Sequence, residues 1–225
     1  MATDATAAAQ QFYGRWADLY DLLASATPGL GRLRARAADA LALGPGDTVV
    51  EMGCGTGANL PHLRERVGPD GRVVGVDFTR GMLDRARERV ERAGWRNVHL
   101  VRADAASVAF REPPDAILAT FVVGMLADPE TTVHRWADAL APGGRLALLD
   151  AAQSRRWFGW PLNQAFRGLV VASSPTGGEG YAAAPWTVLD DRVASARRAL
   201  RERATETTHA EYAAGIVWLA AGRIE

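Results

Sequence analysis

The feature that most constrains this chain is an apolar run, Val49–Met52, that ends in three glycines at alternate positions between Gly53 and Gly57. A second apolar run, 73–76, is closed by an acidic residue, Asp77. This pattern predicts a strand, a tight glycine turn, a helix and a second strand whose tip carries a carboxylate. Such a unit binds a nucleoside-containing cofactor at the carboxyl ends of parallel strands.

The chain continues in the same alternation up to residue 150, and then changes. Strands alternating with helices predict an α/β fold, a doubly wound Rossmann-like sheet with right-handed crossovers. Near the end, two strand-like runs lie so close in sequence that they must pair as an antiparallel hairpin, which gives a seven-stranded, mostly parallel sheet. We expect helices over 7–25, 30–43, 58–67, 129–140 and 189–203, one after Thr79, and strands over 48–52, 72–77, 97–102, 115–122, 145–150, 204–212 and 216–222.

A length of 225 residues favours one domain. Within 1–225 we expect four parts: entry helices over 1–43, a cofactor-binding core over 44–150, an insertion that covers the acceptor over 151–188, and a C-terminal helix and hairpin over 189–225.

Composition excludes several classes of function. The formal net charge is +0, so nothing suggests a nucleic-acid partner. A single cysteine excludes an internal disulfide and a cysteine-cluster metal site, and we expect no metal. The N-terminus lacks a secretion signal, and the longest apolar run, 116–127, is shorter than the roughly 20 residues that a spanning helix needs. We therefore expect a cytoplasmic protein.

The glycine spacing alone leaves the cofactor open. Gly53, Gly55 and Ala58 also fit the dinucleotide fingerprint, with Asp77 at an acceptable distance, which would suit an NAD(P)-dependent oxidoreductase. Four other features favour S-adenosylmethionine. Glu51 would repel a pyrophosphate but pair with an ammonium, and Asp104 can accept a hydrogen bond from an adenine amino group. The third feature is the turn 141–144 before the fifth strand, and the fourth is the antiparallel hairpin at the end of the chain.

With these residues in view, the chain resembles the class I S-adenosylmethionine-dependent methyltransferases. The matching segments are 49–59, 73–83, 102–105, 115–125 and 140–150. The opening segment, 12–21, is similar to the entry helix of a subgroup that includes the ubiquinone/menaquinone C-methyltransferases and the bacterial phospholipid N-methyltransferases. The resemblance implies an enzyme that uses S-adenosylmethionine as cofactor.

The resemblance also implies roles for individual residues. The three glycines let the backbone approach the methionine portion, Asp77 accepts from both ribose hydroxyls, and Asp104 and the Ala105 amide bind the adenine edge. For Asp77 the alternative is a helix-capping carboxylate, and for Asp104 a turn cap. The implied cofactor-binding set is Glu51, Gly53, Cys54, Gly55, Gly57, Asn59, Asp77, Phe78, Met82, Asp104, Ala105 and Phe121, with Phe78 and Met82 against the adenine and Cys54 filling space in the turn.

The sequence offers no clear catalytic base, because each of its four histidines is better explained by a structural role. Phe121, at the tip of the fourth predicted strand, corresponds to residues between cofactor and acceptor. Tyr13, Trp16 and Tyr20 are candidates for the acceptor pocket, and the alternative for Trp16 and Tyr20 is core packing. Without a base, a cofactor-binding subunit that transfers no methyl group remains open.

The segment 155–171 is rich in aromatic residues and arginine. Phe158, Leu162, Phe166 and Leu169 are spaced as one helical stripe. By resemblance this region lies over the acceptor pocket, and its apolar character indicates a small, apolar acceptor such as a quinone, lipid or phenol. It could also touch a membrane surface, or simply pack on its own domain.

Overall fold

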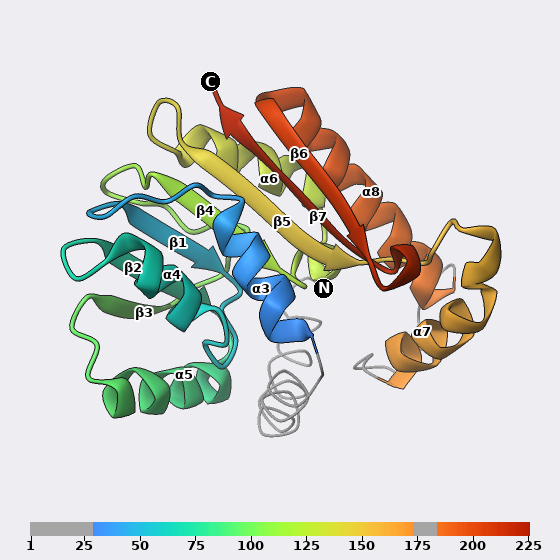
Figure 1. Cartoon of the computed structure of the whole chain (residues 1–225), viewed down its shortest axis with the longest axis horizontal. Helices are drawn as coiled ribbons and strands as arrows, with labels where there is room; N and C mark the ends of the chain where they lie inside the picture. The colour runs from blue at the N-terminus through green and yellow to red at the C-terminus, as the bar shows by residue number, and fades with distance from the viewer. Residues whose placement is uncertain (1–28, 173–183) are drawn as a thin grey trace.

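The computed structural model describes residues 29–172 and 184–225, and their strands form one seven-stranded sheet in the order β3-β2-β1-β4-β5-β7-β6 (Figure 1). β1 to β5 pair in parallel, and β7 is antiparallel to both of its neighbours. The strands are β1 Thr48–Met52, β2 Arg72–Asp77, β3 Val98–Arg102, β4 Ala116–Thr120, β5 Arg145–Ala151, β6 Ala204–Tyr212 and β7 Val217–Ile224. The expected doubly wound sheet with a C-terminal hairpin is confirmed.

Helices cover both faces of this sheet (Figure 1). They are α3 Leu30–Asp39, α4 Leu60–Val67, α5 Arg80–Ala93, α6 Pro129–Ala139, α7 Trp160–Ala172 and α8 Pro185–Arg203, with short 3₁₀ turns η1 Val123–Met125, η2 Trp157–Gly159 and η3 Ala213–Gly215. α3, α4 and α5 pack on one face, and α6 and α8 pack on the other.

The strands are apolar on both sides because each face carries its own core. Along β5, Leu146 and Leu148 belong to the core under α6 and α8, whereas Ala147 and Leu149 belong to the core under α3 to α5. Side chains of a strand alternate between faces, so a continuous apolar run fills both cores at once. Each fully buried leucine stabilises the fold by roughly 1.5–3 kcal/mol.

Several element ends differ from expectation. The strand expected over 115–122 ends at Thr120, because Phe121 has a left-handed backbone with φ 57°. The helix expected over 189–203 begins earlier, at Pro185, whose ring suits a first helical position. The helix expected over 30–43 ends at Asp39. The helix expected over 7–25 lies outside the described residues.

Candidate functional site

The glycine turn after β1 bends with three positive φ angles, 66° at Gly53, 54° at Gly55 and 78° at Gly57. A β-carbon on Gly53 would overlap the Val122 side chain, and one on Gly57 would lie 2.6 Å from Leu60 Cδ1. At Gly55, by contrast, no atom of the described residues other than its chain neighbours lies within 4 Å of the position a β-carbon would take. Gly53 and Gly57 therefore serve packing, whereas Gly55 leaves bare backbone facing open space.

Asp77 closes β2 beside this turn and is buried. Its Oδ2 accepts a hydrogen bond from the Gly55 amide at 2.9 Å, and its Oδ1 accepts one from the Thr79 amide at 2.7 Å. Burial raises the pKa of this carboxyl, and the backbone hydrogen bonds oppose the shift. The hydrogen bond from the Thr79 amide stabilises the start of α5, which is the helix-capping role given above as the alternative for Asp77. A carboxylate offers about four lone-pair sites, so two remain for ligand hydroxyls.

Glu51 lies in the middle of the sheet, 1% exposed, on the face covered by α4. Its Oε1 accepts a hydrogen bond from Asn59 Nδ2, which also donates to Thr120 Oγ1 at 2.7 Å. The three residues come from β1, the residue preceding α4, and β4. Alternation along the strands places Glu51 and Thr120 on the same face, and this brings them to Asn59.

Two polar atoms of this network have no hydrogen-bond partner among the described residues: Glu51 Oε2 and Asn59 Oδ1. Burial raises the pKa of Glu51 to about 8, opposed by the Asn59 hydrogen bond and the positive charge of Arg34. A buried acceptor without a donor is costly. Both atoms are therefore suited to a ligand that brings hydrogen-bond donors.

Cys54 fills space in the glycine turn, as the sequence indicates. Its side chain is 5% exposed, and a β-carbon on Gly75 of β2 would lie 2.9 Å from its Sγ. Burial raises the pKa of the thiol well above its ordinary value. Because the thiolate is the nucleophilic form, this position disfavours a reactive cysteine.

The four residues expected around an adenine lie beyond β2 and β3. Phe78 is half-buried and Met82 is buried in the first turn of α5. Asp104 is exposed, and its Oδ1 accepts a hydrogen bond from the Ala106 amide at 2.9 Å. The Ala105 carbonyl accepts one from Trp136 Nε1 at 2.8 Å. Asp104 therefore caps its turn, as the alternative interpretation expects. A hydrogen bond between Asp104 and adenine stays a prediction.

Phe121 and Asp150 shape the ends of β4 and β5. Phe121 is half-buried, and its amide donates to the Leu149 carbonyl at 2.7 Å. Asp150 accepts hydrogen bonds from the amides of Ala151 at 2.8 Å and Gly124 at 3.4 Å. Burial raises its pKa to about 6. Left-handed backbone at a non-glycine residue and a buried carboxyl both occur often at functional sites.

Sequence reasoning missed Thr120 and Asp150 as members of the site. The signal for Asp150 was available, since it closes an apolar strand just as Asp77 does. Thr120 carried no such signal. Its role depends on the pairing of β4 with β1, which places it beside Asn59 from 61 residues away.

The acceptor side is described only in part, because Tyr13, Trp16 and Tyr20 lie outside the described residues. Phe166 is buried in α7, at 8% exposure, whereas Phe158 lies in η2 and is 47% exposed. Leu162 and Leu169 are exposed as well. The expected stripe therefore does not form one buried face.

No group of three or more histidine, cysteine, aspartate or glutamate side chains could hold a metal ion within residues 29–172 and 184–225. In the same part of the chain, none of the helices is both long enough and apolar enough to cross a bilayer. Two shallow depressions lie at the amino ends of the parallel strands, lined by residues such as Asp138 and Asp115. Ligands of open α/β sheets bind at the opposite, carboxyl edge, so we place no site in these depressions.

A family model described as "Methyltransferase domain" matches residues 49–144. Over 104 residues the chain is 37% identical to the aklanonic acid methyltransferase DauC of Streptomyces sp. strain C5, covering 46% of this chain and 47% of that protein. It is 36% identical over 107 residues to a phosphatidylethanolamine N-methyltransferase of Cereibacter sphaeroides, covering 47% and 51%. A demethylmenaquinone methyltransferase of Listeria welshimeri is 32% identical over 109 residues, covering 48% and 46%. The chain thus spans about half the length of these relatives.

Solved structures agree on the fold. One is a possible histamine N-methyltransferase of Thermotoga maritima, described as S-adenosylmethionine-dependent, with a TM-score of 0.66 at 16% identity over 96% of this chain and 100% of that chain. Another is the N-methyltransferase NodS of Bradyrhizobium japonicum in complex with S-adenosylhomocysteine, with a TM-score of 0.59 at 21% identity over 88% of each chain. The family match confirms the resemblance to methyltransferases that the motifs indicate, and the solved structures show that the chain shares its fold with S-adenosylmethionine-dependent ones.

Proposed function

We propose that this chain, whose residues 49–144 belong to a methyltransferase-domain family, transfers a methyl group from S-adenosylmethionine to a small, largely apolar acceptor. One observation carries the proposal. The open backbone of Gly55, the buried carboxylate of Asp77 and the unpartnered Oε2 of Glu51 all belong to the carboxyl edge of β1 and β2.

The hydrogen-bonding groups at this edge suit that cofactor. Glu51 Oε2, Asn59 Oδ1 and the remaining lone pairs of Asp77 are all acceptors. S-adenosylmethionine brings donors, namely an ammonium group and ribose hydroxyls. The ammonium group would favour the ionised form of Glu51, whereas a dinucleotide would bring a pyrophosphate, which offers no donor and whose negative charge opposes ionisation of the buried Glu51 and Asp77 carboxyl groups. This difference favours the methyltransferase over the NAD(P)-dependent oxidoreductase.

Within this proposal, each described residue has one task. Glu51 and Asn59 bind the ammonium end, and the backbone at Gly55 allows close approach. Asp77 binds the ribose hydroxyls while it holds the Gly55 amide in place. Phe78 and Met82 pack against the adenine, and Asp104 and Ala105 bind its edge.

When bound, S-adenosylmethionine supplies a methyl group that its sulfonium already activates. The chain then needs chiefly to hold the acceptor in line with that methyl group and to exclude water. Such positioning can lower the barrier by roughly 7–11 kcal/mol. Phe121, whose strained backbone closes β4, is our candidate for separating cofactor from acceptor. The acceptor atom loses its proton to solvent or to a base that we do not assign.

The lid segment, defined as residues 151–188, supports an apolar acceptor, because its described part is rich in large apolar side chains. Two of the three relatives are named for a lipid, phosphatidylethanolamine, and a quinone, demethylmenaquinone, which supports an acceptor of that kind. We further propose that 1–225 acts as one domain, with 1–43, 44–150, 151–188 and 189–225 as its parts, and that it works in the cytoplasm.

Calorimetric titration with S-adenosylmethionine, S-adenosylhomocysteine, NADH and NADPH in parallel tests the cofactor. We expect binding of the two adenosyl ligands alone. Binding of a dinucleotide alone would overturn the proposal.

Transfer of a labelled methyl group to quinones, phospholipids and phenols then tests the activity. We expect transfer to at least one apolar class. Cofactor binding with no transfer to any of the three would favour the non-catalytic subunit.

A further inference from the structure

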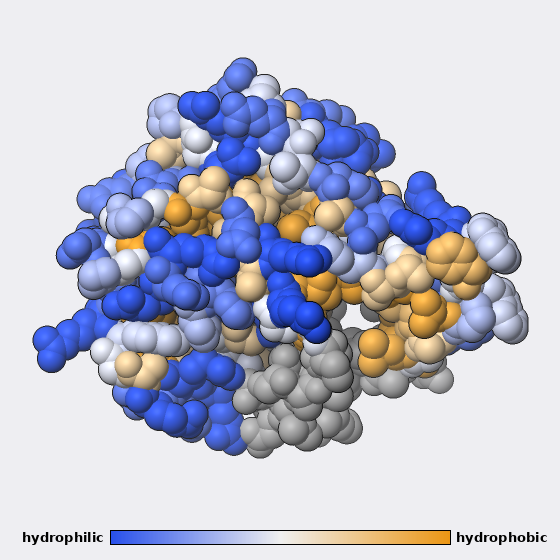
Figure 2. Space-filling view, in the orientation of Figure 1, coloured by the Kyte–Doolittle hydropathy of each residue, from blue (hydrophilic) through white to orange (hydrophobic). Residues whose placement is uncertain are grey.

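Exposed apolar side chains gather on two consecutive elements, η2 and α7. Seven large apolar side chains are exposed among the described residues, and five of them lie between residues 157 and 169. Trp157 is 91% exposed, Trp160 67% and Leu169 59%. Figure 2 shows hydrophobic colour over α7 on a surface that is otherwise mostly hydrophilic. Exposed large apolar side chains gathered in one short segment indicate an interaction surface.

The folded core does not explain these side chains, because polar contacts hold this region. Asn163 donates to the Ser154 carbonyl at 3.0 Å, and Arg167 Nε donates to Gln153 Oε1 at 2.6 Å. Gln153 in turn donates to Asp190 of α8 through its amide and its side chain. Only Phe166 is buried among the side chains of 160–171. Among the described residues, Trp157, Trp160, Leu162 and Leu169 therefore stay exposed.

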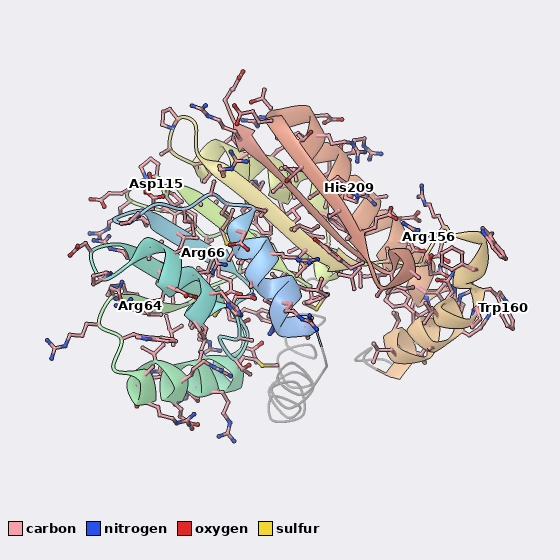
Figure 3. The ribbon with its side chains drawn as sticks, viewed as in Figure 1. Arg64, Arg66, Asp115, Arg156, Trp160 and His209 are labelled. Carbon is pink, nitrogen blue, oxygen red and sulfur yellow. The ribbon has the colours of Figure 1, made fainter. Side chains whose placement is uncertain are left out.

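The charge of the same segment has one sign. Residues 151–172 contain three arginines and no aspartate or glutamate. Arg155 and Arg156 are both exposed just before the two tryptophans, and Figure 3 shows Arg156 and Trp160 at the same end of the molecule. Arg156 forms an ion pair with Glu211 of β6 at 3.3 Å, and both side chains are more than a third exposed. Such a pair is weak in water and leaves the positive charge available.

Other charged groups face this region from α8 and β6. Asp190 is engaged by Gln153, Asp191 is exposed, and Arg197 adds a positive charge next to Arg155. The net charge of the side chains around Trp157 and Trp160 therefore stays positive.

We propose that the segment from Arg155 to Trp160, with its two exposed arginines and two exposed tryptophans, docks on a membrane surface containing anionic phospholipids. Tryptophan favours the boundary between headgroups and acyl chains, and arginine favours anionic headgroups. α7 has 13 residues, about 20 Å of helix at 1.5 Å per residue, so it lies on a bilayer of about 30 Å and does not span it. This inference does not depend on methyl transfer.

Sedimentation with vesicles tests the proposal on the full chain. The vesicles are phosphatidylcholine alone, or phosphatidylcholine with one quarter phosphatidylglycerol. We expect binding to the anionic vesicles, at least tenfold weaker binding to phosphatidylcholine alone, and a further loss in 0.5 M salt. Trp157→Ser with Trp160→Ser, and separately Arg155→Gln with Arg156→Gln, should each weaken binding at least tenfold.

Matched controls come from the other end of the sheet. Val101→Ser removes an exposed apolar side chain of β3, and Arg92→Gln with Arg96→Gln removes two exposed charges at the end of α5. Both should leave vesicle binding unchanged. All variants should keep the thermal midpoint and S-adenosylhomocysteine affinity of the parent chain, which separates this proposal from the proposed function.

Three results would overturn the inference. The first is no sedimentation with anionic vesicles, and the second is equal loss in the control variants. The third is a dimer, seen by sedimentation equilibrium, that the tryptophan substitutions abolish while vesicles bind nothing, since a second copy would then cover this face.

Discussion

The cofactor edge of the sheet and the lid segment are built in opposite ways. At the cofactor edge, polar groups are buried and fixed: Asp77 holds two backbone amides, and Asn59 joins Glu51 to Thr120. In the described part of the lid segment, apolar groups are exposed, and polar contacts such as Asn163 to Ser154 hold the chain. The first arrangement is preorganised for one fixed ligand, whereas the second is suited to apolar partners of varied shape.

The difference follows from where each region is attached. The cofactor edge continues the strands whose side chains fill both cores, so its geometry is tied to global folding. α7 packs mainly on α8 and buries Phe166 alone among its described side chains. We therefore expect substitutions at the cofactor edge to act on the whole fold or on cofactor affinity, and substitutions in α7 to act locally.

The largest effect separates two glycines of one turn. Gly53→Ala places a methyl group on Val122 and should destabilise the fold by several kcal/mol, as overpacking and a strained φ combine. In Gly55→Ala the added methyl group meets no atom of the described part of the chain, so the substitution should cost only about 1–2 kcal/mol while S-adenosylhomocysteine affinity falls at least tenfold. Thermal unfolding and calorimetry measure the two effects. Unchanged affinity in a folded Gly55→Ala variant would contradict close cofactor approach at this residue.

A second prediction concerns the buried Glu51 carboxyl. Its pKa is about 8 in the folded chain against an ordinary value of 4.5. The folded state keeps a proton that the unfolded state loses, so this group lowers stability as pH rises from about 4.5 to 8, by roughly 1.4 kcal/mol per pH unit. Glu51→Gln cannot ionise and should flatten that slope, stabilising the ligand-free chain at pH 7 by up to about 3 kcal/mol.

Urea unfolding at pH 5, 6, 7 and 8 measures this slope. Glu65→Gln on α4 is the matched control, because Glu65 is exposed. The same slope in Glu51→Gln and in the parent chain would show that Glu51 is ionised when folded. The polar groups of the cofactor edge would then be less buried than the contrast with the lid segment requires.

Asp77→Asn tests the other carboxylate of the edge. The amide keeps one acceptor oxygen and replaces the other with a donor, so it cannot serve both the Gly55 and Thr79 amides and a ribose. Hydrogen bonds to charged groups contribute roughly 1.5–3 kcal/mol each, so calorimetry should show at least tenfold weaker S-adenosylhomocysteine binding. Asp70→Asn, in the exposed turn before β2, should change nothing. If Asp77→Asn bound S-adenosylhomocysteine as tightly as the parent chain, Asp77 would only cap α5 and would not bind the ribose.

The sequence predicted the cofactor edge well because its signals are local. The strand over 48–52 and the position of Asp77 follow from runs of a few residues. Phe121 shows the limit: its side chain does not predict a φ of 57°, and the hydrogen bond from its amide to the Leu149 carbonyl is a contact between neighbouring strands. Asp150 likewise gains one of its partners, the Gly124 amide, from η1 after the neighbouring strand β4, and only the pairing of β4 with β5 reveals it.

The lid segment was harder because its burial depends on contacts, and not on spacing. Phe166 and Leu169 are three residues apart and share a helical face, yet one is 8% exposed and the other 59%. Phe158 lies in η2, before the helix begins at Trp160, so it does not extend the stripe. Helical spacing predicts which side chains share a face, and tertiary contacts decide which of them that face buries.

Phe166→Ala tests whether the lid segment opens on its own. Loss of its one buried side chain should speed amide exchange in 160–171, measured by mass spectrometry, while the strands β1, β4 and β5 keep their protection. Leu169→Ala should alter neither, because Leu169 is already exposed. Faster amide exchange in the strands as well would show that α7 and the sheet unfold as one unit. The lid segment would then not open independently of the cofactor edge.

The smallest effect is expected at Asp104, where the cofactor edge meets solvent. Asp104→Asn keeps the acceptor for the Ala106 amide, so the turn should stay intact and the thermal midpoint unchanged. Its second oxygen becomes a donor, and one hydrogen bond to an adenine amino group would be lost. In this exposed position such a bond contributes about 0.5–1.5 kcal/mol, so S-adenosylhomocysteine should bind roughly two- to tenfold more weakly. Unchanged affinity with an unchanged midpoint would leave Asp104 as a turn cap and move adenine recognition to Phe78, Met82 and the backbone of Ala105.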